Sequence, residues 1–203
     1  RDVAPSRGLG DVYKRQAWTK EETVCFGIIL IFLSGILAIS VYKHKILKQQ
    51  AVAILLLAIY LGIVLGSTVF TRESSICSYK LMPLWSWKEI LFGNDARELL
   101  IENLLNVILL LPMGALLPFV FGKKLKIKKA FLYGFFVSVV IECCQLVFKC
   151  GLFEWDDMIH NGIGCMLGDM IGNTILNEWQ RLKGNRNMEG GNQVRNNKDS
   201  VSI

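Results

Sequence analysis

The sequence predicts an all-α, polytopic membrane protein, a helix bundle with about five transmembrane helices. Of its 203 residues, 52% are hydrophobic, and the mean hydropathy is +0.39. These apolar residues form solid blocks, whereas a soluble domain shows amphipathic patterns. The Lys and Arg residues behind the net charge of +6 lie between the blocks and in the tail. Basic residues in those places are typical of topology signals, so we expect a lipid bilayer partner and no nucleic acid.

Five segments fit a bilayer, because a spanning helix needs about 20 mostly apolar residues. The first two are uncharged, and the fourth holds Glu142. The third contains Pro112 and Pro118, which spanning helices tolerate when neighbouring groups satisfy the freed backbone. The fifth is the weakest by hydropathy, since it is rich in Gly and holds Asp169. The segments are 24–42, 51–70, 104–121, 130–148 and 158–176.

The chain divides into three parts around this membrane domain, which we place at 24–178. Residues 1–23 are expected to be a non-native or disordered leader, because the first sixteen show no apolar period and the first Met is Met82. Residues 179–203 are polar and are expected to form a disordered cytoplasmic tail. Six Cys residues show no zinc-site spacing, so no metal site is predicted, and the sequence names no cofactor.

The positions of the basic residues predict how the bundle is oriented in the membrane. The connections after the first and third segments hold three and five Lys with no acid, and the tail is also basic. By the positive-inside rule these regions are cytoplasmic, which places the N-terminus outside and the C-terminus inside. Loop 71–98 is then external, and its Trp85 and Trp87 favour the membrane interface, either as simple anchors or to grip a lipid or ligand.

Polar residues from three segments meet in the outer half of this bundle. A charged group within a span costs at least about 2.5–3.5 kcal/mol, so it usually faces a partner or a cavity. The spacings of three and four residues place several of them on common helix faces. The candidate polar pocket consists of Glu102, Asn103, Asn106, Glu142, Gln145, Asp156, Asp157, His160 and Asn161.

For each of these residues, a purely structural role is an alternative to a role in binding or catalysis. Glu142 could bind a ligand or act as a general acid, or it could only join helices by hydrogen bonds. Asp156 and Asp157 could simply begin a helix, where acids are favoured, and His160 could be an interfacial residue. A divalent cation on this group is only weakly indicated.

The fifth segment carries Gly164, Gly168 and Gly172 at four-residue intervals. Small residues at this spacing let helix backbones approach closely. Tight packing inside the bundle is the favoured interpretation, and homodimerisation is the alternative. The oligomeric state is not given by the sequence.

Four stretches together resemble the VanZ family, named for a teicoplanin-resistance membrane protein. They are YKLMPL at 79–84, ENLLN at 102–106 with PMG at 112–114, ECCQ at 142–145, and FEWDD at 153–157 with HNGIG at 160–164 and Gly168. Many members have an Arg shortly before the Phe-acid-x-Asp-Asp run, where this chain has Gly151 or Leu152. The resemblance implies a bacterial cytoplasmic-membrane protein of the cell envelope that lowers susceptibility to glycopeptide antibiotics, but it supplies no reaction.

Two functions follow as hypotheses. The leading one is a non-transporting protein that binds a lipid-linked cell-wall precursor or a lipoglycopeptide at the outer polar pocket. The alternative is an intramembrane enzyme that acts on a lipid-linked sugar or phosphate, with Glu142 or Asp157 as acid or base and His160 assisting. A transporter is disfavoured, because no inverted repeat is visible and Asp169 is the only charge in the inner half.

Overall fold

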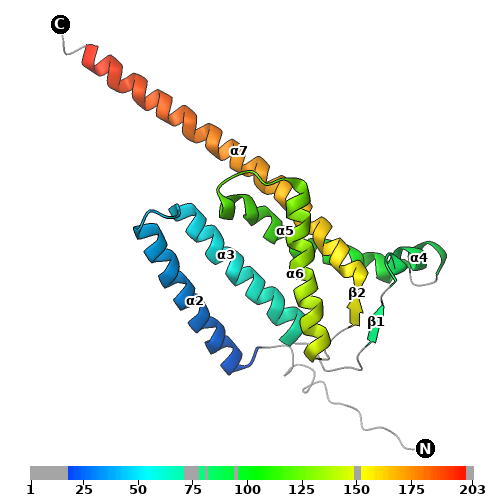
Figure 1. Cartoon of the computed structure of the whole chain (residues 1–203). Helices are drawn as coiled ribbons and strands as arrows, with labels where there is room; N and C mark the ends of the chain where they lie inside the picture. Colours follow the sequence, from blue (N-terminus) through cyan, green and yellow to red (C-terminus); the bar gives the residue numbers. More distant parts are fainter. Residues whose placement is uncertain (1–17, 71–77, 81, 94–95, 149–151, 200–203) are drawn as a thin grey trace, which may run out of the picture.

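The bundle is all-α, as predicted. The computed structural model describes residues 18–70, 78–80, 82–93, 96–148 and 152–199 (Figure 1). A π-helical turn, η1 (Gly66–Phe70), extends the second helix, and two three-residue strands, β1 (Ser78–Lys80) and β2 (Leu152–Glu154), pair outside the helices. The helices are α2 (Lys20–Tyr42), α3 (Lys48–Leu65), α4 (Trp85–Phe92), α5 (Ala96–Phe121), α6 (Ile127–Phe148) and α7 (Trp155–Asp199).

Four helices of the described part are long and apolar enough to cross a membrane. They are Lys20–Tyr42, Lys48–Val69, Ala96–Phe121 and Ile127–Phe148, and each contains or nearly matches one of the first four predicted segments. The fifth predicted segment lies within α7, which packs against α5 and α6. Its Asp169 is fully buried. The side of α7 that packs against α5 and α6 can carry Gly and Asp without exposing them to lipid, which explains the weak hydropathy, while large apolar side chains such as Ile171 and Ile175 are exposed on its other side.

The end of α7 differs from our expectation. Residues 179–199, predicted to be disordered, continue the helix as far as Asp199. A growing helix adds residues without a new nucleation cost, so a polar segment can extend one that packing already fixes. In Figure 1 this part of α7 leaves the bundle and runs away from the other helices.

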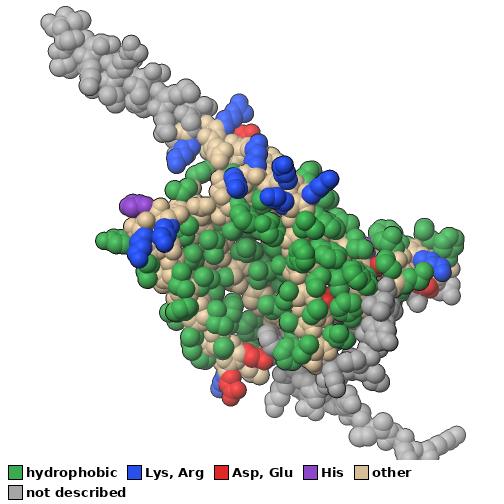
Figure 2. Space-filling model, viewed as in Figure 1, with side chains coloured by type: hydrophobic (Ala, Val, Ile, Leu, Met, Phe, Trp, Pro, Cys, Tyr) green, Lys and Arg blue, Asp and Glu red, His purple; other side chains and the backbone are tan. Residues whose placement is uncertain are grey.

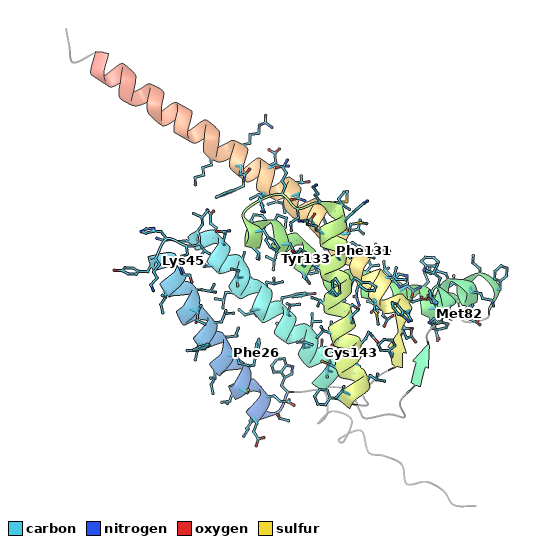
Figure 3. All side chains as sticks on the ribbon, viewed as in Figure 1. Phe26, Lys45, Met82, Phe131, Tyr133 and Cys143 are labelled. Atoms are coloured by element: carbon cyan, nitrogen blue, oxygen red, sulfur yellow. The ribbon has the colours of Figure 1, made fainter. Side chains whose placement is uncertain are left out.

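Helices α2 and α3 form an antiparallel pair at one side of the bundle (Figure 1). The ring of Phe26 lies between them, as the side-chain view shows (Figure 3), and a Cβ on Gly62 would overlap that ring. Large apolar side chains of α2, such as Phe32 and Ile31, are exposed, as expected for a helix that faces lipid.

Lys and Arg side chains gather at one end of the bundle, over the α2–α3 and α5–α6 turns and the adjoining part of α7 (Figure 2). Lys45 marks this end in Figure 3. Glu21 and Glu22, in the first turn of α2, lie at the opposite end. The two ends of the helices therefore differ in charge, and we call the first one the basic end.

The closest helix contact joins α5 and α7, which run parallel. A Cβ on Gly164 would overlap the carbonyl oxygen of Val107, and a Cβ on Gly168 that of Leu111. Gly172 meets the backbone of α5 one turn further along. The three glycines thus let the two backbones touch within one chain.

The apolar core lies where α5, α6 and α7 meet, with α3 against its side. The hydroxyl of Tyr60 on α3 donates a hydrogen bond to the carbonyl of Leu109 on α5, close to Pro112. The core side chains are Leu110, Met113, Leu117, Ala130 and Cys165.

Candidate functional site

The two short strands bring together motif segments that are far apart in the sequence. Strands β1 and β2 pair in parallel, with Tyr79 opposite Phe153 and Lys80 opposite Glu154. Parallel strands need a long connection, and here it contains α4, α5 and α6. The pairing places the start of α4 beside the start of α7 at the end of the bundle away from the basic turns (Figure 1).

Asp156 holds the N-terminus of α4. Its carboxylate accepts hydrogen bonds from the backbone amide of Leu84 and from the amide and hydroxyl of Ser86, the last two at 2.9 and 2.5 Å. Leu84 itself adopts a left-handed conformation, with φ of 60°. Free amides and the helix dipole favour an anion at this position. A carboxylate with no exposed surface is thereby stabilised by three donors.

Two further hydrogen bonds fasten α4 to the bundle. The amide of Asn103 on α5 donates to the hydroxyl of Ser86 at 3.1 Å. The indole Nε1 of Trp87 donates to Nε2 of His160 on α7 at 3.0 Å. Asp156 and His160 are four residues apart on α7, so one face of that helix makes both attachments.

Hydrogen bonds between amides, carboxylates and hydroxyls continue this polar group into α5 and α6. The amide of Asn106 donates to Oδ1 of Asp157 at 2.6 Å, and this pair is half-buried. Asn161, which is buried, donates to the hydroxyl of Ser138 on α6 at 2.8 Å. All three helices that surround the core therefore contribute to one polar cluster.

Glu142 and Gln145 extend the cluster along α6. The Glu142 carboxylate accepts a hydrogen bond from the backbone amide of Glu154 at 3.2 Å, which anchors the end of β2. Gln145 donates to the carbonyl of Thr68 at 3.1 Å. Thr68 lies in the π-helical turn η1, and π-helical turns occur frequently at functional sites. Both α6 side chains are buried, with only 3 and 4% of their surface exposed.

The structure gathers eight of the nine predicted residues into this polar cluster. Six of them are buried, and only Asn106 and Asp157 are half-buried. Glu102 differs from the prediction: it is exposed and takes part in none of the hydrogen bonds described above. Because α5 turns by 100° per residue, Asn103 and Asn106 face the bundle while Glu102 faces outward. The group is therefore a hydrogen-bonded cluster with one half-buried pair, where an open pocket was predicted.

Sequence reasoning missed several members of the cluster. Ser86 stands between two Trp residues, and Thr68 and Ser138 lie in apolar segments, so no pattern singled them out. The candidate polar residues were limited to carboxylates, amides and His, whereas the hydroxyls of Ser86 and Ser138 and the backbone carbonyl of Thr68 complete the hydrogen bonding. Within the described residues, no three His, Cys, Asp or Glu side chains come together as a metal site.

Comparison with known proteins gives one family. The family described as VanZ/LLP1 has a model that matches residues 51–176, more than half of the 203 residues. The match contains every residue of the polar cluster, most of α3 and the whole of α4, α5 and α6. No curated protein and no solved structure matches the chain.

Proposed function

Because this chain belongs to the VanZ/LLP1 family, we propose that it is a bacterial envelope protein that binds a lipid-linked molecule at the polar cluster. The occupant is a lipid-linked cell-wall precursor or a lipoglycopeptide, and binding lowers susceptibility to glycopeptides such as teicoplanin. The proposal places the protein in the bacterial cytoplasmic membrane, with the basic end in the cytoplasm, the N-terminus outside and the C-terminus inside. The polar cluster then lies in the outer leaflet, where such molecules are found.

The pair of Asn106 and Asp157 is the observation that carries this proposal. It is a half-buried pair in a cluster whose other predicted residues are buried and hydrogen-bonded. An amide and a carboxylate can bond sugar hydroxyls and peptide amides, which are the polar groups of a cell-wall precursor. Fixed neighbours keep this pair oriented before a ligand arrives, which reduces the entropy lost on binding.

Helix α4, whose first turn is bonded to Asp156, supplies an apolar surface at the same end of the bundle. Leu91 and Phe92 are 71 and 84% exposed, and Trp87 and Met82, which is labelled in Figure 3, are also exposed. A short helix with such side chains at the membrane interface can rest against acyl or prenyl chains. The cluster and α4 together therefore offer both kinds of contact that a lipid-linked molecule needs.

Variants of the cluster test the proposal. Asp157→Asn and Glu142→Gln keep the side-chain shapes but remove the negative charges. Both should abolish any protection against teicoplanin in a susceptible bacterial host while membrane yield stays unchanged. Glu102→Gln is the matched control, because Glu102 is a carboxylate of the same helix bundle outside the cluster, and it should protect like the wild type. Full protection in both cluster variants would contradict the proposal.

One observation favours an intramembrane enzyme as the second candidate. Nε2 of His160 accepts a hydrogen bond from Nε1–H of Trp87, so a neutral ring carries its own proton on Nδ1. A buried imidazole with a proton to donate, one turn from Asp156, has the groups that general acid–base catalysis uses. Turnover of a lipid-linked sugar or phosphate by the purified protein, lost in His160→Gln, would support this candidate over simple binding.

A further inference from the structure

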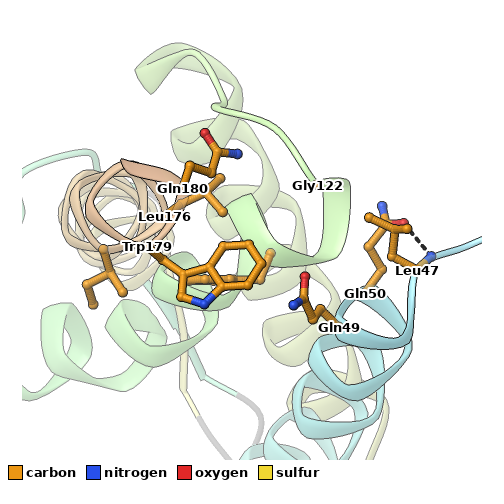
Figure 4. A pocket seen from close by; sticks show the side chains of 9 residues that line it. Leu47, Gln49, Gln50, Gly122, Leu176, Trp179 and Gln180 are labelled. Atoms are coloured by element: carbon orange, nitrogen blue, oxygen red, sulfur yellow. Dashed lines mark hydrogen bonds between the residues drawn. The ribbon is translucent and has the colours of Figure 1, made fainter. Parts of the chain in front are cut away.

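A hollow lies at the basic end, on the opposite side of the bundle from the polar cluster. It has a volume of about 280 Å³ and lies between the start of α3, the end of α5 and α7. In Figure 4 the Trp179 ring of α7 extends across it toward Gln49 of α3. Its lining residues are Leu47, Gln49, Gln50, Phe119, Gly122, Ile175, Leu176, Trp179 and Gln180.

Hydrogen bonds at its edge give this hollow a fixed shape. The side chain of Gln50 accepts from the amide of Leu47 at 2.9 Å and donates to the carbonyl of Val120 at 3.3 Å. Gly122, which follows α5, has φ of 64° and lies so close to Gln50 that a Cβ would crowd it. The start of α3 and the end of α5 are therefore tied together beneath the opening.

An apolar slot continues from this hollow along α3 and α5. The slot has a volume of about 410 Å³ and shares Gln49 and Phe119 with the hollow. Beyond these two and Lys48, its lining is aliphatic, with Val52, Ala53, Leu56 and Leu116. The combined space has the amides of Gln49 and Gln50 in the hollow at the basic end and mainly aliphatic side chains along the slot, and a phospholipid likewise has a polar end and a hydrocarbon end.

The charges around the opening are mainly positive. Lys48 lies on the edge of the slot, and Nζ of Lys183 is 5.3 Å from the centre of the Trp179 ring. The turns on either side, 43–48 and 122–129, contain Lys and no acidic residue. Glu178, the acidic residue nearest in sequence to Trp179, forms an ion pair with Arg181 at 3.8 Å.

We propose that this space binds one anionic phospholipid, with its phosphate between Lys48 and Lys183 and an acyl chain in the slot along α3 and α5. Lys residues near an anionic lipid surface attract it. Trp179 follows the predicted segment 158–176 by three residues, and Trp is a residue type that favours the membrane–water interface. The site is separate from the polar cluster, so it goes beyond the proposed function and does not depend on it.

The fluorescence of Trp179 can report directly on lipid binding in this space. The full-length protein in phosphatidylcholine nanodiscs is titrated with phosphatidylglycerol that carries a doxyl quencher on its acyl chain, and the same is done with doxyl phosphatidylcholine. The chain has five Trp residues, so the Trp179 signal is obtained by subtracting the fluorescence of Trp179→Phe. Doxyl phosphatidylglycerol should quench Trp179 at a concentration about tenfold lower or more than doxyl phosphatidylcholine, because only the former carries a net negative charge.

Paired charge variants identify the site. Lys48→Gln with Lys183→Gln removes two charges at the opening, whereas Lys128→Gln with Lys129→Gln removes two exposed charges of the same end that line neither space. The first pair should remove most of the preference for phosphatidylglycerol, and the second should keep it within about twofold. Equal quenching by the two lipids, or equal losses in the two variants, would overturn the proposal and indicate ordinary surrounding lipid.

Discussion

The carboxylate of Asp156 accepts two hydrogen bonds from Ser86, one from its amide and one from its hydroxyl, although 70 residues separate the two in sequence. Asp156 therefore stabilises the N-terminus of α4 from the first turn of α7. The sequence left open that Asp156 only begins its own helix, but its carboxylate is bonded to a different helix, α4. The hydrogen bonds described for α4 join it to this side chain, to Asn103 and to His160.

Asp156→Ala should release α4. The change leaves the amides of Leu84 and Ser86 without their acceptor in a buried place, and lost hydrogen bonds to a charged group cost about 1.5–3 kcal/mol each at most. We expect the free energy of unfolding in detergent to fall by about 2–4 kcal/mol, since some of these groups can find water once α4 moves. Thermal or denaturant unfolding measures this loss, and protease should cleave more readily near α4.

Two variants serve as controls for that prediction. Asp156→Asn keeps one acceptor oxygen and should lose less stability than Asp156→Ala. Glu102→Ala removes an exposed carboxylate near the start of α5 and should change stability by less than about 0.5 kcal/mol. An Asp156→Ala protein as stable and as protease-resistant as the wild type would show that α4 is held by other contacts.

Trp87 and His160 should be energetically coupled. Trp87→Phe keeps an aromatic ring but removes the donated proton, and His160→Phe removes the acceptor. A double-mutant cycle on thermal unfolding should give a coupling free energy of about 0.5–1.5 kcal/mol, the usual contribution of a hydrogen bond. Additive effects of the two changes would mean that the contact contributes nothing to stability.

Gly168 and Gly35 should respond oppositely to Ala. At Gly168 the added Cβ would overlap the carbonyl oxygen of Leu111, so α7 must move away from α5. Overpacking of this kind costs about 1–3 kcal/mol. At Gly35 on α2 the Cβ meets nothing within 4 Å, and Ala should be neutral or slightly stabilising because it favours helix. Equal melting temperatures for the two variants would contradict the close contact between α5 and α7.

The proposed orientation predicts a labelling pattern. Lys45→Cys in the α2–α3 turn should react with a membrane-impermeant maleimide only after cells are permeabilised. Glu21→Cys, at the other end of α2, should react in intact cells. Labelling of the unsubstituted protein gives the background from its own Cys residues. The reverse pattern would invert the bundle and place the polar cluster in the inner leaflet.

The first four spans could be predicted from hydropathy, whereas the fifth predicted segment lies in α7, which is not among the helices of the described part that are apolar enough to cross a membrane. The predicted segment 130–148 and α6 (Ile127–Phe148) end at the same residue, and the predicted 104–121 ends with α5 (Ala96–Phe121). Both helices begin earlier in the sequence than predicted. Polar residues such as Glu98 and Lys128 belong to the first turns of these helices but do not raise the hydropathy.

The cluster could be predicted only in part, because sequence spacing shows which residues share a helix and not which helices meet. Asn106 and Asp157 were placed together by depth, and the structure joins them by a hydrogen bond. The pairing of β1 with β2 and the helical form of α4 are long-range or short-segment features with no hydropathy signal. The hydrogen bond from Gln145 goes to the carbonyl of Thr68 in a π-helical turn, and no residue pattern predicts such a turn.

Because α4 precedes Asp156 by about 70 residues in the sequence, α4 is synthesised before the side chain that holds its N-terminus. Ser86 leaves the ribosome 70 residues before its partner, which corresponds to roughly 4–14 s at about 5–20 residues per second. Four spans are made before α7, and in that interval α4 has no Asp156 to hold it. The final fold at this end of the bundle is therefore completed by the last helix, and a nascent chain arrested before Trp155 should contain its spans with α4 still accessible to protease.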